Sequence, residues 1–94
     1  MNRIKRMNVE LRKFYLFLKY VNSKNDVLDI VFNIRNNDDE MISTTTAYKY
    51  LAILRESGFC DVKRVNASLI PSLTGKGQRL REILKDLVYN KGVV

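Results

Sequence analysis

The sequence predicts a small, mostly helical α+β fold in which three helices precede a two-stranded β-hairpin and a final helix. Two observations carry this prediction. Apolar residues recur with the helical period in four segments, whereas the stretch after Gly58 changes to the character of β-strands. A chain of 94 residues has room for one hydrophobic core, so we expect a single domain over residues 1–94.

The first helix is expected over residues 1–22. Its apolar residues are spaced alternately three and four apart, which is the seam of a coiled coil. The seam consists of Ile4, Met7, Leu11, Phe14, Leu18 and Val21. Further apolar residues widen the stripe, so the helix needs a second cover besides its own domain, and we expect it in a dimer interface. The alternative is a long helix that lies wholly in the core of one chain.

A second helix is expected over residues 27–35, where the apolar residues fall on one helical stripe. Asn25 or Asp26 can cap its N-terminus, because a short polar side chain there accepts hydrogen bonds from the first N–H groups. Polar and acidic residues fill positions 36–40. They predict a loop, which makes the connection to the next helix longer than a tight helix-turn-helix turn.

The third helix has the clearest boundaries. Ser43 is a favourable N-cap for a helix over residues 44–57, and Gly58 can adopt the left-handed conformation that ends a helix. The face expected to be buried comprises Ala47, Leu51 and Leu54, widened by Tyr50 and Ile53.

A β-hairpin and a last helix are expected after Gly58. Residues 60–65 and 68–73 flank Asn66 and Ala67, which predict a hairpin turn. Pro71 has no N–H group to donate, so it fits only an edge position or a bulge. Thr74 can cap a helix over residues 74–90, whose apolar stripe consists of Leu80, Ile83, Leu84, Leu87 and Val88.

Charge is distributed unevenly along the chain. The net charge is +7, to which residues 1–25 contribute +6, residues 26–58 contribute −3 and residues 59–94 contribute +4. The excess of cations therefore lies at the two ends. A small domain with this excess favours a polyanionic partner, and nucleic acid is the first class of partner to consider.

Several function classes are excluded by residues that the sequence lacks. It has one cysteine and no histidine, which rules out an internal disulfide, a histidine zinc site and a serine–histidine or cysteine–histidine catalytic device. Asp38, Asp39 and Glu40 are adjacent in the expected loop and make a poor metal or acid–base site. Cys60 is expected to be a buried, inert thiol; the alternatives are a redox sensor and an intersubunit disulfide. We therefore expect no enzymatic activity, no cofactor and no metal.

The sequence also predicts a cytoplasmic protein. Its apolar runs are far shorter than the roughly 20 residues that a bilayer-spanning helix needs. The basic N-terminus lacks the apolar stretch and the small-residue cleavage site of a signal peptide.

The order of the expected elements is that of a winged helix-turn-helix. Residues 42–59 place Ser43 before a polar turn and a Leu-x-x-Leu-x-x-x-Gly run, and residues 73–80 read Leu-Thr-Gly-Lys-Gly-Gln-Arg-Leu. In this order and spacing the two segments resemble the MarR/ArsR/PadR-like regulators of prokaryotes and archaea, over about residues 26–84. The resemblance implies a helix-turn-helix at 26–59, a wing at 60–73, and a sequence-specific DNA-binding regulator. Gly75 departs from the family pattern, which often has an acidic residue there.

The resemblance makes residues 44–57 the recognition helix. Small hydroxyls and longer polar side chains near its N-terminus are expected to contact DNA, namely Ser43, Thr44, Thr45, Thr46, Tyr48 and Lys49. Lys63, Arg64 and Asn66 are the expected contacts of the wing with phosphate or the minor groove. The alternative is that the Ser-Thr-Thr-Thr run only caps a core helix and the wing charges only protect a strand edge.

The predicted function is that of a homodimeric transcriptional regulator whose two recognition helices enter successive major grooves. The expected dimer interface joins the first and last helices through Ile4, Met7, Leu11, Phe14, Leu18, Leu84 and Leu87. The alternative is a winged helix that binds another protein and no specific DNA. The net acidity of residues 26–58 favours that alternative.

Overall fold

The computed structural model describes the backbone of residues 3–89 and the side chains of residues 9–89. The described residues form four helices and one antiparallel two-stranded sheet, in the order α1 (Arg3–Lys19), α2 (Val27–Asp38), α3 (Thr44–Glu56), β1 (Cys60–Val65), β2 (Ser68–Leu73) and α4 (Gly75–Tyr89). This order confirms the expected α+β, mostly helical, winged helix-turn-helix architecture.

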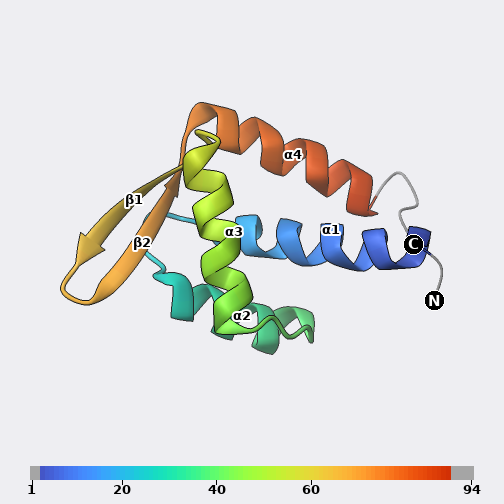
Figure 1. The fold of residues 1–94 in the computed structure, drawn as a ribbon, viewed down its shortest axis with the longest axis horizontal. Coiled ribbons are helices and arrows are strands. Elements are labelled where there is room, and N and C mark those ends of the chain that lie inside the picture. Colours follow the sequence, from blue (N-terminus) through green and yellow to red (C-terminus); the bar gives the residue numbers. More distant parts are fainter. Residues whose placement is uncertain (1–2, 90–94) are drawn as a thin grey trace.

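Figure 1 shows how the elements are arranged. Helices α1 and α4 lie side by side, and α3 crosses beside the C-terminal end of α1. The hairpin projects away from the helices, on the side opposite the first turn of α1 and the last turn of α4. The core lies where α1, α2 and α3 meet. Its fully buried side chains include Leu16, Phe17 and Leu18 of α1, Ile30 and Ile34 of α2, and Leu54 of α3.

The helix ends follow the capping residues found in the sequence. Asp26 forms a capping box with Asp29 at the start of α2, and the Ser43 side chain accepts a hydrogen bond from the Thr46 N–H at the start of α3. Gly58, with a φ of 79°, ends α3. The N–H of Phe59 then donates to the Leu54 carbonyl at 2.8 Å, which closes a Schellman motif.

The prediction that residues 36–40 form a loop was wrong for residues 36–38, because α2 continues to Asp38. Two residues at the C-terminal end of α1 stabilise the last turn of α2. Tyr20 Oη donates to Asp38 Oδ2 at 2.6 Å, and Lys19 Nζ donates to Asp38 Oδ1 at 2.9 Å. Long-range hydrogen bonds therefore outweigh the weak helix propensity of the polar residues. Asp39 ends α2 in the left-handed conformation, with a φ of 53°.

The hairpin has the boundaries that the sequence predicts. Asn66 occupies the turn with a φ of 55°, a conformation that asparagine tolerates better than most residues. Val62 pairs with Pro71, whose side chain is fully buried. Both strands of a two-stranded sheet are edge strands, which is where proline is accommodated.

Gly77 fixes the position of α4 against the base of the hairpin. A Cβ atom at Gly77 would lie 2.0 Å from the carbonyl oxygen of Phe59, so any larger residue would push the helix away. Thr74 strengthens this junction. Its hydroxyl accepts a hydrogen bond from the Gly77 N–H and donates one to the Gly58 carbonyl. The Leu-Thr-Gly-Lys-Gly segment thus joins the end of α3, the hairpin and α4.

The packing corrects part of the expected dimer interface. Leu18 is completely buried and Leu84 is 6 % exposed in a single chain, because α1 and α4 pack on each other. Leu11 and Phe14 pack partly against the same core, whereas Leu87 is exposed. The side chains of Ile4 and Met7 lie outside the described residues. In its described C-terminal half, α1 is therefore a core helix of one chain, as the alternative interpretation proposes.

None of the helices in the described part of the chain is long and apolar enough to cross a membrane.

Candidate nucleic-acid interface

Helix α3 has one buried and one exposed face. Ala47, Tyr50, Leu51 and Leu54 are buried, in agreement with the expected apolar face. Ile53 was expected on that face as well, but this prediction was wrong, because its side chain is 46 % exposed. The opposite face presents Thr45, Lys49, Ala52, Ile53 and Glu56, which recur at helical spacing.

The four hydroxyl residues expected to contact DNA near the N-terminus of α3 have two different roles in the structure. Ser43 Oγ accepts from the Thr46 N–H at 3.0 Å and lies 2.9 Å from Thr46 Oγ1, to which it donates. These two hydroxyls therefore take part in capping, as the alternative interpretation proposes. Thr44 and Thr45 are exposed and point their hydroxyl and methyl groups to the surroundings.

The hairpin carries its polar residues on two different faces. Successive side chains of a strand alternate between faces, so Lys63 and Arg64 point in opposite directions. Arg64 shares a face with Val62 and lies opposite Leu69 in the register. Both cations and Asn66 at the tip are exposed. Arg64 therefore lies on the side of the hairpin that faces α3. Of the two cations, it would be the first to contact a duplex bound on that side.

A small groove runs between α3 and the hairpin. It is lined by Tyr48, Leu51, Ala52, Arg55, Val62 and Leu69, and has a volume of about 120 Å³. Known small-molecule sites are roughly 300–1,000 Å³, so the groove is too small for such a ligand. Tyr48 and Arg55 place a hydroxyl and a guanidinium on the wall formed by α3.

Arg55 is a candidate contact that was not predicted from the sequence. It lies on the wing side of α3, two turns after Tyr48 and three residues after Ala52. The sequence does contain a pattern that includes Arg55, since residues 48, 52 and 55 follow the i, i+4, i+7 spacing of one helix face. The position in the groove depends on where the hairpin packs, which the spacing alone does not give.

Most acids of residues 26–58 are engaged within the chain. Asp26 and Asp29 form the capping box of α2. Asp38 binds Lys19 and Tyr20, and Arg12 Nε lies 3.1 Å from Glu40 Oε1. The net acidity of this segment is therefore balanced by cations of α1, and the exposed face of α3 itself carries one acid, Glu56, and one cation, Lys49.

The pKa of Asp38 reflects this balance. Burial of the carboxyl would raise its pKa, but the hydrogen bonds from Tyr20 and Lys19 outweigh burial and hold the pKa below its ordinary value. The carboxylate is thus ionised at neutral pH and remains paired with Lys19.

Cys60 is buried at the start of β1, as expected. Burial, with a smaller contribution from the neighbouring Asp61 carboxylate, raises the pKa of its thiol to about 11. The thiol is therefore protonated and unreactive at neutral pH. No group of three residues suited to holding a metal ion occurs among the residues that the structure describes.

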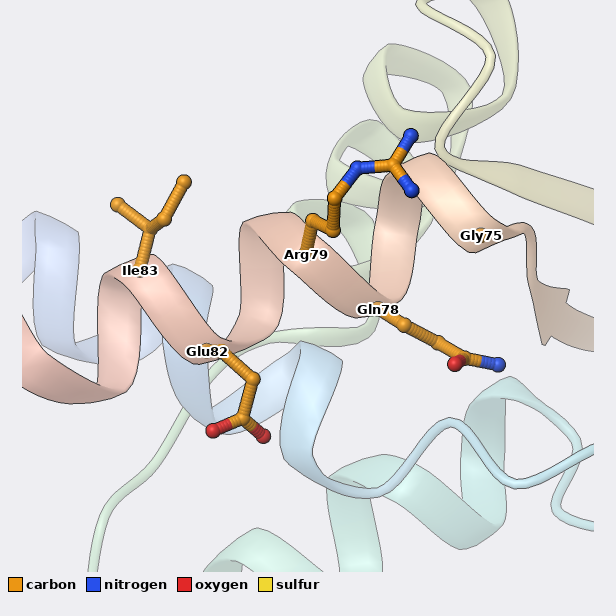
Figure 2. Close-up of a pocket in the computed structure, with 5 residues that line it drawn as sticks. All are labelled: Gly75, Gln78, Arg79, Glu82 and Ile83. Carbon is orange, nitrogen blue, oxygen red and sulfur yellow. The ribbon is translucent and has the colours of Figure 1, made fainter.

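A shallow hollow of about 500 Å³ lies along the outer side of α4. Figure 2 shows that a single helix lines it, with Gln78 and Glu82 pointing to one side and Arg79 and Ile83 to the other. Because no second element encloses it, this surface offers no small-molecule site. Ile83 is 57 % exposed, and together with the exposed Leu87 it gives α4 an apolar outer stripe.

Comparison with known proteins supports the fold. No protein-family model matches the chain, and no curated protein matches its sequence. Among solved structures it is similar to the crystal structure of SSV1 F-93, with a TM-score of 0.65 and 21 % sequence identity over 86 % of this chain and 84 % of that one. The winged-helix fold is therefore shown, whereas the specific MarR/ArsR/PadR resemblance stays a prediction.

Proposed function

We propose that this chain is a cytoplasmic, sequence-specific binder of double-stranded DNA and acts as a homodimeric transcriptional regulator. The observation that carries the proposal is the exposed face of α3 beside the hairpin. It combines the free hydroxyls of Thr44 and Thr45 with Lys49, and the hairpin adds exposed cations next to it. Helix α3 and the hairpin lie next to each other in the structure.

The N-terminal half of α3 is suited to the major groove. This groove admits an α-helix, and the first residues of a recognition helix contact the base edges there. Thr44 and Thr45 offer short donors, acceptors and methyl groups, and Lys49 follows one turn later on the same face as Thr45. Ser43 and Thr46 support this surface by fixing the helix N-terminus.

The groove between α3 and the hairpin is suited to one strand of the DNA backbone. Tyr48 and Arg55 line it on α3, and Arg64 and Asn66 lie toward the hairpin tip. A hydroxyl and two guanidinium groups are strong donors to phosphate oxygens. In this proposal they supply affinity and position, and α3 supplies the sequence preference. Lys63, on the other face of the hairpin, contributes only to the general attraction of the duplex.

The outer stripe of α4 is the proposed dimer surface. Leu18 and Leu84 are committed to the core of one chain, whereas Ile83 and Leu87 are exposed one turn apart on α4. Gln78, Arg79 and Glu82 flank this stripe with both signs of charge, which suits a two-fold contact between identical surfaces. A two-fold dimer would present its recognition helices to major grooves about 34 Å apart.

The proposal is tested by selecting bound sequences from a random pool of duplexes and measuring the molar mass in solution by light scattering. We expect a two-fold-symmetric site and the mass of a dimer. A pool without enrichment would contradict sequence-specific binding, and a monomer would contradict the symmetric assembly. Ile83→Glu should convert the dimer to a monomer, because it places a charge in the apolar stripe.

An alternative function is that of a protein-interaction module. Its support is the outer face of α2, where Leu28 is 57 % and Phe32 is 64 % exposed one turn apart. Aromatic residues such as Phe32 are enriched in protein–protein interfaces. A monomer that enriches no duplex would favour this alternative.

A further inference from the structure

Ile53 is an aliphatic residue in the middle of a polar, exposed surface. Its side chain is 46 % exposed, although the core-facing residues on both sides of it, Tyr50 and Leu54, are buried. It follows Lys49 by one turn of α3 and Ala52 by one residue, both of which are exposed. A solvent-exposed isoleucine contributes little to the stability of the helix, since β-branched residues are weak helix formers.

Ile53 forms a continuous face with Thr45, Lys49 and Ala52. Thr45, Lys49 and Ile53 are spaced four residues apart, and Ala52 follows Lys49 by three residues, which places all of them on the exposed side of the helix. From Thr45 to Ile53 the helix rises about 12 Å, at roughly 1.5 Å per residue. That length corresponds to roughly three or four base pairs at about 3.4 Å per step.

Three of the five side chains on the exposed face of α3 end in methyl groups. Thr45 has one methyl group beside its hydroxyl, Ala52 has its Cβ, and Ile53 has two. In the major groove, the C5-methyl of thymine is the apolar group of the standard base pairs, whereas guanine, cytosine and adenine present hydrogen-bonding groups. A methyl-rich face over a G·C pair would bury the hydrogen-bonding groups of that base pair without partners, which is unfavourable.

We propose that Ile53, together with Thr45 and Ala52, selects thymine at defined positions of the DNA site by contacting its C5-methyl group. The inference rests on the proposed DNA-binding function and adds its base preference. Lys49 and Glu56 are the charged residues of this face. Lys49 lies between Thr45 and Ala52 along the helix, so the preferred half-site contains thymines next to a position where a cation is accepted, such as guanine.

The experiment measures binding of the chain to the duplex enriched from a random pool and to copies in which single thymines are replaced by deoxyuridine. This replacement removes the methyl group and leaves the hydrogen-bonding edge unchanged. For the wild type, we expect about fourfold weaker binding for each contacted methyl group removed. For Ile53→Ala, replacement at the position facing residue 53 should have no further effect.

Leu28→Ala is the matched control. Leu28 is a similarly sized aliphatic residue that is 57 % exposed, but it lies on the outer face of α2. Leu28→Ala should keep the full difference between thymine and deoxyuridine. Both substitutions are on the surface, so both variants should retain the helical circular dichroism and the melting temperature of the wild type.

The outcomes separate the inference from the function on which it rests. Equal binding of thymine and deoxyuridine duplexes by the wild type, or an unchanged difference in Ile53→Ala, would overturn the thymine preference while DNA binding stands. A chain that enriches no duplex and binds none of them would overturn the proposed function itself.

Discussion

Cations on α1 and cations on the α3–hairpin side have different surroundings, although both contribute to the net charge of +7. On α1, Arg12 and Lys19 form ion pairs with Glu40 and Asp38. On the other side, Lys49 and the cations of the hairpin are exposed, and the ion pairs of the described residues do not include them. Arg12 and Lys19 thus stabilise the fold, whereas Lys49 and the cations of the hairpin are available to a partner.

This difference explains how a net acidic segment can include the helix that we propose to contact DNA. Asp38 and Glu40 lie in that segment, but their charges face α1 and not the duplex in the proposed complex. A count of charges along the chain does not distinguish cations that pair internally from cations that remain exposed. Substitutions in the two groups should therefore differ in their effects on DNA affinity and on stability.

The double variant Lys49→Ala/Arg64→Ala should bind duplex DNA much more weakly than the wild type. Each substitution removes one cation from the proposed interface, so we expect roughly tenfold weaker binding for each and a salt dependence whose slope falls by about one unit for each phosphate that is no longer bound. Fluorescence anisotropy titrations between about 50 and 200 mM salt, a range over which phosphate contacts show clearly, measure both quantities. Since both side chains are exposed, the melting temperature should not change. Unchanged affinity for every duplex would contradict the interface.

Asp38→Asn should have the opposite effects: it should lower the stability of the fold and leave the affinity for DNA unchanged. The Asp38 side chain is 8 % exposed and accepts hydrogen bonds from Lys19 and Tyr20. Loss of its charge should lower the free energy of unfolding by about 1.5–3 kcal/mol, a typical range for hydrogen bonds to a charged group. Urea denaturation followed by circular dichroism measures this effect. The affinity of the folded variant for DNA should equal that of the wild type. A large loss of affinity would contradict the division into cations that stabilise the fold and cations that contact DNA.

The effect of Asp38 should also depend on pH. The pKa of its carboxyl is lower in the folded chain than its ordinary value of 3.8, so its contribution to stability is fully present above that pH. The contribution is lost as the pH falls through the lowered pKa. Wild type and Asp38→Asn should therefore differ in unfolding free energy at pH 7 and converge below pH 3.8. A difference that persists unchanged at lower pH would show that the charge is not responsible.

Arg12→Gln should have the smallest effect. The Arg12 and Glu40 side chains are 36 % and 29 % exposed, so solvent screens this pair. We expect a loss of unfolding free energy of at most about 1 kcal/mol and no loss of DNA affinity beyond that due to one unit of net charge. Urea denaturation and anisotropy on the same preparation measure the two quantities. A loss of affinity as large as that of Lys49→Ala would place α1 in the interface.

Local sequence signals determined most of the fold. Ser43 and Gly58 bound α3, Thr74 starts α4, and Asn66 forms the turn of the hairpin. Each of these residues acts through its own backbone or through residues three or four positions away, so the sequence pattern contains the necessary information.

The sequence patterns gave wrong or incomplete predictions where contacts between residues far apart in the chain determine the structure. The last turn of α2 depends on Tyr20 and Lys19, which are 18 and 19 residues away from Asp38. Ile53 fits an apolar stripe by spacing, yet the packing of α3 leaves it exposed. Arg55 enters the candidate site only because the hairpin packs beside α3. The wide stripe of α1 predicted a partner chain, whereas α2, α3 and α4 cover much of it within one chain.

The most direct test of the account is to map the surface that duplex DNA contacts by amide chemical-shift changes in NMR spectra of the chain. We predict that the changes gather in residues 44–55 of α3 and residues 63–66 of the hairpin. Residues of α1 near Arg12 and Lys19 should change little. Changes concentrated on α1 and α2, with α3 and the hairpin unaffected, would contradict the account.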